Sequence, residues 1–207
     1  MSAPAADVAA HWDRVYDRRA TDAVSWYQEV PERSLRLLTK AVPSGQIVDV
    51  GAGASGLAAN LVTRGYRVIL VDVSHRVLEL DRDRLEDHAL YVETDLLEWE
   101  HGEHVDGWHD RAFFHFLVNP SDQARYVELA TQTISPGGAL IMGVFAADGP
   151  TSCSGLPTSG HDAEKLAELF SAGFTLETSE REMHRTPTGI VQPFTWVVLR
   201  RNARESA

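Results

Sequence analysis

The sequence predicts a doubly wound α/β fold, in which one sheet of seven strands carries helices on both faces. From residue 46 onward, short apolar runs alternate with segments of helical periodicity, which is typical of strands joined by crossover helices. A glycine-rich turn directly follows the first apolar run. The chain ends on two extended segments separated only by the short turn at 186–190, and this spacing predicts a C-terminal antiparallel hairpin.

The expected elements follow in order along the chain. Residues 7–19 and 31–42 have helical periodicity, and together they form an N-terminal helical region at 1–42 that precedes a core at 46–200. Strands are expected at 46–50, 67–71, 89–93, 104–109, 138–145, 173–184 and 191–200. The core helices are expected at 55–64, 74–86, 121–134 and 162–171, and the glycine-, proline- and serine-rich stretch 146–160 is expected to be a loop.

Length and composition indicate a single soluble domain covering residues 1–207. The hydrophobic share is 43% and the charged share 24%, both ordinary for a globular protein. No apolar run approaches the roughly 20 residues of a membrane span, and the first residues lack the pattern of a secretory signal. Cys153 is the only cysteine, so no intramolecular disulfide can form, which fits a cytoplasmic location. We expect a monomer or a homodimer.

Charge argues against a nucleic-acid partner. The net charge is −11, whereas nucleic-acid binding usually needs a basic stripe. Arg200, Arg201 and Arg204 form the closest basic cluster, and we expect them to be solvated at the C-terminal tail. His101 and His104 stand close together without a third ligand in view, so a surface loop is expected there and no metal site.

The glycine-rich turn predicts a nucleotide site. Gly51, Gly53 and Gly56 are spaced Gly-x-Gly-x-x-Gly between a strand and a helix, where glycine lets the backbone turn tightly and approach a ligand. Asp72 closes the second strand about 20 residues after the first glycine, which is where a carboxylate accepts hydrogen bonds from both hydroxyls of a ribose. The ligand is therefore expected to contain adenosine.

Two cofactors fit this pattern, a dinucleotide and S-adenosylmethionine. Asp49 stands two residues before Gly51, where it would repel a phosphate but would suit the ammonium group of a methionine moiety, directly or through water. Asp95 follows the third apolar run and is a candidate acceptor for an adenine amino group. A loop acid or a helix cap is the structural alternative for Asp49.

These segments resemble the class I S-adenosylmethionine-dependent methyltransferases. The resemblance rests on VDVGAGAS, VDVS, ETDL and SPGGALIMGVF, and it extends over nearly the whole chain. Ser55 replaces a glycine of many members. The strings HWDRVYDRRATDAVSWYQ and WHDRAFFHFL resemble a bacterial subgroup whose substrate is not settled. The resemblance implies a Rossmann-like sheet, S-adenosylmethionine as cofactor, and cofactor contacts from Asp49, Gly51, Ala52, Gly53, Ser55, Asp72, Val73, Asp95 and Leu96.

The end of the fourth strand supplies the next candidates, because ligands of open α/β sheets bind beyond the carboxyl ends of the strands. Trp108 is expected to contact the cofactor. His109 is a candidate general base, since an imidazole titrates near neutrality, and Arg111 is a candidate partner for an anionic substrate. Alternatively, Asp110 caps a helix and Arg111 forms a surface pair. A soft nucleophile such as a thiolate would need no base.

The N-terminal region is expected to cover the site as a lid. Trp12, Tyr16, Trp26 and Tyr27 gather within sixteen residues, and aromatic faces suit a sulfonium cation. The resemblance to the bacterial subgroup implies that the string from Ser25 to Gln28 lies near the methionine end, with Trp26 at the cofactor and Tyr27 at the substrate. The alternative is that the aromatic residues only pack an extra helix onto the sheet.

The function predicted from these residues is S-adenosylmethionine-dependent methyl transfer to a nitrogen, oxygen or sulfur atom of a small molecule. Cys153 and His184 are further substrate candidates, in a loop and at a strand end that can overhang the crevice. Three alternatives stay open: a protein lysine methyltransferase, a nicotinamide-dependent oxidoreductase, and a non-catalytic S-adenosylmethionine-binding module.

Overall fold

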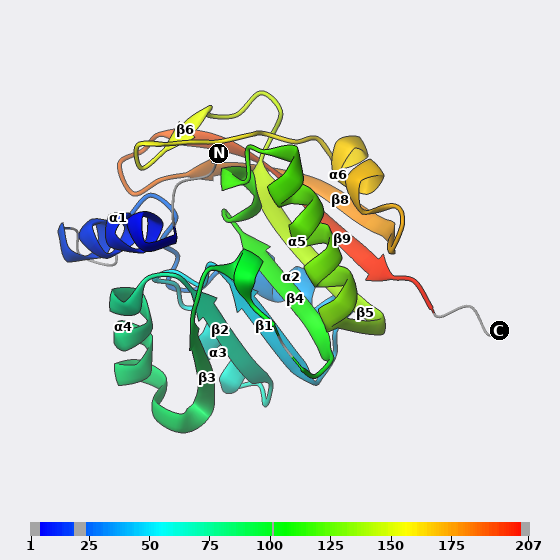
Figure 1. The fold of residues 1–207 in the computed structure, drawn as a ribbon, viewed down its shortest axis with the longest axis horizontal. Coiled ribbons are helices and arrows are strands. Elements are labelled where there is room, and N and C mark those ends of the chain that lie inside the picture. The colour runs from blue at the N-terminus through cyan, green and yellow to red at the C-terminus, as the bar shows by residue number, and fades with distance from the viewer. Residues whose placement is uncertain (1–4, 19–23, 101, 204–207) are drawn as a thin grey trace.

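A seven-stranded mixed sheet forms the centre of the molecule (Figure 1). The computed structural model describes residues 5–18, 24–100 and 102–203. The strand order is β3-β2-β1-β4-β5-β9-β8, with β1 to β5 parallel and β9 antiparallel to both of its neighbours. The strands are β1 (Gln46–Val50), β2 (Arg67–Asp72), β3 (Ala89–Glu93), β4 (Val105–Arg111), β5 (Ile134–Phe145), β8 (Phe174–Arg185) and β9 (Val191–Arg201). The predicted fold class and terminal hairpin are confirmed.

Helices cover both faces of the sheet and divide the core in two. One apolar cluster joins the sheet to α2 (Glu32–Ala41), α3 (Leu57–Val62) and α4 (His75–Leu85). The other joins it to α5 (Pro120–Thr133) and α6 (Ala163–Phe170). Short 3₁₀ turns lie at η2 (Glu86–His88), η3 (Leu96–Glu98) and η4 (Phe114–Phe116).

The alternation of side chains along a strand explains how the nearly all-apolar strand β1 contributes to both clusters. Ile47 of β1 packs in the first cluster, whereas its neighbours Val48 and Val50 pack in the second. Successive side chains of a strand point to opposite faces, so a strand covered on both sides is apolar throughout. Local caps set the helix starts: the Ser74 hydroxyl accepts the Val77 N–H at α4, and the Asp162 carboxylate accepts the Lys165 N–H at α6.

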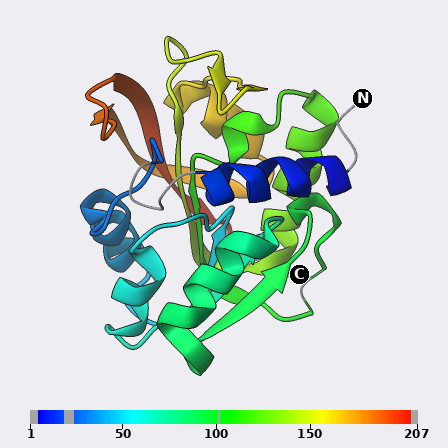
Figure 2. The same ribbon diagram turned by 90° about the vertical axis from the view of Figure 1, so that its left-hand side faces the viewer.

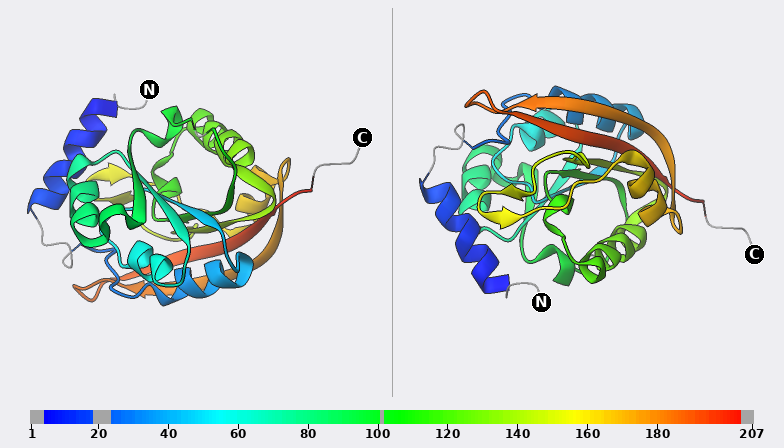
Figure 3. Two further views of the ribbon diagram at one scale, coloured as in Figure 1. Left: turned by 90° about the horizontal axis from the view of Figure 1, so that it is seen from below. Right: turned by 90° about the horizontal axis from the view of Figure 1, so that it is seen from above.

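Helix α1 (Ala5–Arg18) lies across the edge of the sheet where the parallel strands end, beside α4 (Figure 2). Seen from below and from above, α1 and α6 lie at opposite ends of the molecule (Figure 3). This position brings α1 over the carboxyl ends of β1 and β2. None of the described helices is both long and apolar enough to cross a membrane.

The loop expected at 146–160 contains a small hairpin, which corrects that expectation. Strands β6 (Ser152–Cys153) and β7 (Leu156–Pro157) pair across a two-residue turn. Ser154 and Gly155 have φ angles of 50° and 82°, as the tight turn of such a hairpin requires. The hairpin hangs over the same edge of the sheet as α1.

Two of the C-terminal arginines are bound rather than solvated. Arg200 pairs with Glu177 and donates to the Ala41 carbonyl, and Arg201 donates to the Thr131 and Gly173 carbonyls. They belong to β9 and tie its end to neighbouring segments, so the expectation of a solvated cluster is wrong for both. Arg204 lies outside the described residues.

Candidate active site

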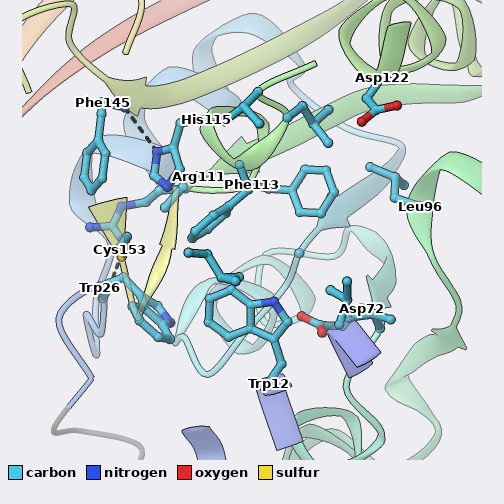
Figure 4. Close-up of a pocket in the computed structure, with 18 of the residues that line it drawn as sticks. Trp12, Trp26, Asp72, Leu96, Arg111, Phe113, His115, Asp122, Phe145 and Cys153 are labelled. Carbon is cyan, nitrogen blue, oxygen red and sulfur yellow. Dashed lines mark hydrogen bonds between the residues drawn. The ribbon is translucent and has the colours of Figure 1, made fainter. Parts of the chain in front are cut away.

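A cavity of about 400 Å³ lies at the carboxyl ends of the parallel strands, as the strand-end rule predicts. Helix α1, the segment around Trp26 and the β6–β7 hairpin contribute to its walls. The close-up separates two ends (Figure 4). We call the part around Asp72, Val73, Asp95 and Leu96 the acidic end, and the part around Arg111, His115, Phe145, Cys153 and Phe194 the basic end.

The glycine turn after β1 is shaped for close approach. Gly51 and Gly53 both have a φ of 54°, a conformation that side chains with a Cβ rarely adopt. A Cβ on Gly51 would lie 2.7 Å from the Phe113 ring, and one on Gly53 would lie 3.0 Å from the Tyr16 hydroxyl. Both glycines are therefore required by backbone conformation and by space.

Asp72 lines the cavity and holds the glycine turn in place. Its carboxylate accepts the Gly53 N–H at 3.0 Å and the Ser74 N–H at 2.8 Å. Burial raises the pKa of Asp72 to about 6, although these two hydrogen bonds favour the charged form. At neutral pH the group is mostly ionised, so it presents a buried negative charge to the cavity.

The other residues of the acidic end divide into two groups. Gly51, Val73, Asp95 and Leu96 line the cavity, and the Asp95 carboxylate also accepts the Leu97 N–H at 3.0 Å. Ala52, Gly53 and Ser55 do not line it. Ala52 donates its N–H to the Val71 carbonyl, and the Ser55 hydroxyl accepts the Leu57 N–H. These two residues hold the turn, and their predicted contact with a cofactor stays a prediction.

An aromatic cluster joins α1 to the segment after it. The Trp12 ring centroid lies 5.7 Å from that of Trp26 and 5.3 Å from that of Phe116. Trp12, Tyr16 and Trp26 all line the cavity, so they both pack together and face its interior. Tyr27 does not line the cavity, and its contact with substrate stays a prediction.

Trp108 and His109 do not line the cavity, although both were predicted as site residues. Strand β4 continues to Arg111, so both residues lie within the strand and not at its end. Trp108 is fully buried and donates to the Tyr126 hydroxyl at 2.9 Å. It packs in the core on one face of the sheet, and His109 points to the other face.

His109 belongs to a buried chain of polar groups. Its Nδ1 lies 2.7 Å from the Asp49 carboxylate and its Nε2 lies 2.9 Å from the Ser34 hydroxyl. All three residues are buried, and none lines the cavity. Because His109 and Asp49 are bound to each other away from the cavity, catalysis by His109 and contact between Asp49 and an ammonium group, directly or through water, stay predictions.

Arg111 closes β4 and reaches the cavity from the strand end. Its Nη1 donates to the Trp26 carbonyl at 2.5 Å, and its guanidinium lies 5.8 Å from the centre of the Phe194 ring. Burial lowers the pKa of Arg111 to about 10, so the side chain keeps its charge at neutral pH. The alternative of an exposed surface pair is not what the structure contains.

The remaining substrate candidates lie on either side of the cavity wall. Cys153 of the β6–β7 hairpin lines the cavity beside Arg111 (Figure 4). His184 lies behind the wall, where its Nε2 is 2.9 Å from the Ser25 carbonyl and its ring packs on the edge of Phe194. Substrate contact by His184 stays a prediction. Within the described part of the chain, no group of three or more potential metal ligands occurs, and His101 lies outside it.

Sequence reasoning missed three residues of the basic end, His115, Phe145 and Phe194. Phe145 ends β5, so the strand-end rule could have placed it at the cavity. The polar His115 within the aromatic run FFHF was a usable signal for a buried functional side chain. Phe194 lies inside the antiparallel β9, and no sequence pattern marks its position.

Comparison with known proteins agrees with this geometry. The sequence profile of a family described as "Methyltransferase domain" matches residues 47–138. Protein-L-isoaspartate O-methyltransferase of Chlorobium luteolum is 27% identical over 137 residues, which make up 66% of this chain. The chain spans about half the length of that relative, 53%.

Two solved structures share the fold over most of both chains. One is the 1,6-didemethyltoxoflavin-N1-methyltransferase of Burkholderia thailandensis with 1,6-didemethyltoxoflavin and S-adenosylhomocysteine bound, with a TM-score of 0.74, 21% identity, and coverage of 98% of this chain and 92% of that one. The other is the N-methyltransferase NodS of Bradyrhizobium japonicum WM9 with S-adenosylhomocysteine, with a TM-score of 0.69, 15% identity, and coverage of 91% and 97%. Residues 47–138 therefore match a methyltransferase domain, and the chain shares the fold of these two methyltransferases.

Proposed function

We propose that this protein transfers the methyl group of S-adenosylmethionine to a nitrogen, oxygen or sulfur atom of a small molecule. The observation that carries the proposal is the buried Asp72 carboxylate, which faces the cavity while it holds the glycine turn through the Gly53 N–H. A charged acceptor at the end of β2 beside such a turn suits the two hydroxyls of a ribose.

The residues of the acidic end fit the cofactor. Asp72 would accept hydrogen bonds from the ribose hydroxyls, and Asp95 would accept one from the adenine amino group. Trp12 and Trp26 place aromatic faces in the cavity, which suit a sulfonium cation. S-adenosylmethionine supplies an activated methyl group when bound, so the protein's part is to align the acceptor and exclude water.

The cover over the cavity supports a small-molecule acceptor. Helix α1, the Trp26 segment and the β6–β7 hairpin line a space of about 400 Å³, which is in the size range of small-molecule sites. One of the solved structures named above, the 1,6-didemethyltoxoflavin-N1-methyltransferase, holds 1,6-didemethyltoxoflavin together with S-adenosylhomocysteine.

Neither histidine near the reaction centre suits a general base. His109 is buried outside the cavity with both ring nitrogens engaged. His115 lines the cavity, but burial in apolar surroundings, followed by the charges of His161 and Arg111, lowers its pKa to about 3. We therefore propose that the acceptor atom is nucleophilic without help from a histidine.

The test uses methyl-tritiated S-adenosylmethionine, purified protein and a desalted host extract to which the metabolite fraction is returned. Tritium is then counted separately in precipitated protein and in soluble small molecules, with the Gly53→Val variant as a blank. Label in small molecules is expected and gives a product to identify. Label in protein would favour a lysine methyltransferase, and failure to bind S-adenosylhomocysteine would contradict the cofactor.

A further inference from the structure

Arg111 offers an unused pair of hydrogen-bond donors at the basic end. Its Nη1 is bound to the Trp26 carbonyl, but Nε and Nη2 are buried without a hydrogen-bond partner among the described residues. These two nitrogens lie along one edge of the guanidinium plane, and their N–H bonds point the same way. That edge matches the two oxygens of a carboxylate, which an arginine binds in a bidentate manner.

The protein's own carboxylates near Arg111 are engaged elsewhere. Glu182 and Asp49 are close enough to act on its charge. However, Glu182 accepts the Trp196 indole N–H at 2.6 Å, and Asp49 is bound to His109. A buried cation with two free donors is costly, because the hydrogen bonds that water gave are not replaced. Among the described residues, no carboxylate is therefore bound to the free edge of Arg111 at the basic end.

His115 adds a third donor beside Arg111. Its Nδ1 accepts the Phe145 N–H at 3.3 Å, so in the neutral ring the proton is on Nε2. Nε2 is buried without a partner among the described residues, and the charge of Arg111 acts on this ring. Figure 4 shows the two side chains next to each other at the basic end.

We infer that the acceptor molecule carries a carboxylate, which binds to the Nε and Nη2 groups of Arg111 with the Nε2–H of His115 as an additional donor. The inference rests on the proposed function and names its substrate class. Phe113, Phe145 and Phe194 line the same cavity, so the rest of the molecule is expected to be flat and apolar, as in an aromatic acid.

The test compares acids with their primary amides, which have nearly the same shape but no charge. Benzoate, salicylate and indole-3-acetate, each paired with its amide, are titrated into the protein by calorimetry, with and without saturating S-adenosylhomocysteine. The acid of at least one pair is expected to bind about 10-fold more tightly than its amide, as for a charge-assisted bidentate contact. The affinity for S-adenosylhomocysteine is measured first in every sample.

Three variants test whether Arg111 and His115 cause the preference for an acid over its amide. Arg111→Gln should abolish this preference. Arg111→Lys keeps the charge but lacks the two adjacent N–H donors of the guanidinium, so it should reduce the preference strongly. His115→Asn keeps an acceptor for the Phe145 N–H but removes the extra donor, so a loss of several-fold is expected. Arg181→Gln is the matched control, because Arg181 is exposed and pairs with Asp148 outside the cavity. Circular dichroism checks that each variant is folded.

The outcomes separate this inference from the proposed function. Equal binding of acid and amide, no binding of any acid by protein that binds S-adenosylhomocysteine, or an acid preference that survives in Arg111→Gln and Arg111→Lys would each overturn the inference. Methyl transfer as such would be untouched by those results. Absence of S-adenosylhomocysteine binding would contradict the proposed function, while the acid–amide comparison without it would still report on Arg111.

Discussion

The two ends of the cavity satisfy their polar groups in opposite ways. At the acidic end, Asp72 is bound by two backbone N–H groups, and Asp95 by one. At the basic end, Arg111 and His115 keep buried donors that have no partner in the part of the chain that the structure describes. A site whose polar groups are already satisfied is preorganised for one ligand, whereas unused donors indicate that a ligand group completes the other.

The two ends also differ in how the chain builds them. The acidic end comes from the consecutive strand ends of β1, β2 and β3 and rests largely on backbone groups. The basic end collects side chains from β4, η4, β5, the β6–β7 hairpin and β9. The first arrangement suits a ligand shared by a family, and the second suits a ligand particular to one protein.

The largest effect on stability is expected from His109→Ala. This variant tests whether His109 has a structural role outside both ends of the cavity. The change leaves the Asp49 carboxylate buried without its partner, so the free energy of unfolding should fall by about 3–5 kcal/mol. Urea unfolding followed by circular dichroism measures this. Ser34→Ala removes only a neutral hydrogen bond and should cost about 1 kcal/mol.

His109→Gln keeps a donor for Asp49 and separates stability from chemistry. It should restore much of the lost stability and leave S-adenosylhomocysteine binding within about threefold of the wild type. If His109→Gln were as stable as the wild type but lost methyl transfer, His109 would instead act as a general base.

Gly53→Val should disable the acidic end and leave the basic end intact. A β-branched residue is strained at a φ of 54°, and its Cβ would meet the Tyr16 hydroxyl. Affinity for S-adenosylhomocysteine should fall by about 100-fold or more, equivalent to about 2.7 kcal/mol. Gly102→Val is the control, since a Cβ there meets no atom within 4 Å. Unchanged affinity would show that the turn is not the cofactor cradle.

The sequence predicts the sheet and the acidic end well, for a physical reason. Strand β1 was predicted with its observed bounds. Gly51, Gly53 and Asp72 lie within 22 consecutive residues, so their spacing can be recognised from the sequence alone. A backbone turn and a strand end need little tertiary information.

The basic end was harder to predict because its members meet only through tertiary packing. The expected end of the fourth strand at residue 109 lay two residues short of Arg111. This small error moved Trp108 and His109 from inside the strand to its rim, where they were taken as site residues. Burial of a histidine against a carboxylate and a serine from distant segments has no sequence pattern.

Asp72→Ala should weaken S-adenosylhomocysteine binding by about 10-fold or more, because hydrogen bonds to a charged group contribute about 1.5–3 kcal/mol. The variant also releases the Gly53 and Ser74 N–H groups, which loosens the turn. Calorimetry measures the affinity, and acid binding at the basic end should be little changed. Asp162→Ala is a control that removes a distant helix cap and should leave the affinity as it is. If Asp72→Ala and Asp162→Ala bound S-adenosylhomocysteine equally well, Asp72 would not be the residue that binds the ribose.

The smallest effect is a pH dependence that only the acidic end should have. Burial raises the pKa of Asp72 to about 6, so its ionised, hydrogen-bond-accepting form is lost as pH falls through that value. Affinity for S-adenosylhomocysteine should therefore decrease by up to about 10-fold between pH 7.5 and pH 5. Asp72→Asn should bind more weakly at pH 7.5 and show a flatter profile.

Stability of the unliganded protein should change with pH in the opposite direction. A carboxyl whose pKa is raised by folding contributes stability that is fully present below its unfolded pKa and is lost as pH rises through about 6. Thermal unfolding from pH 4 to pH 7.5 should show this contribution as a difference between the wild type and Asp72→Asn. If the wild type and Asp72→Asn gained the same stability on acidification, the titration would belong to another buried carboxyl, such as Asp81, whose pKa burial raises to about 7.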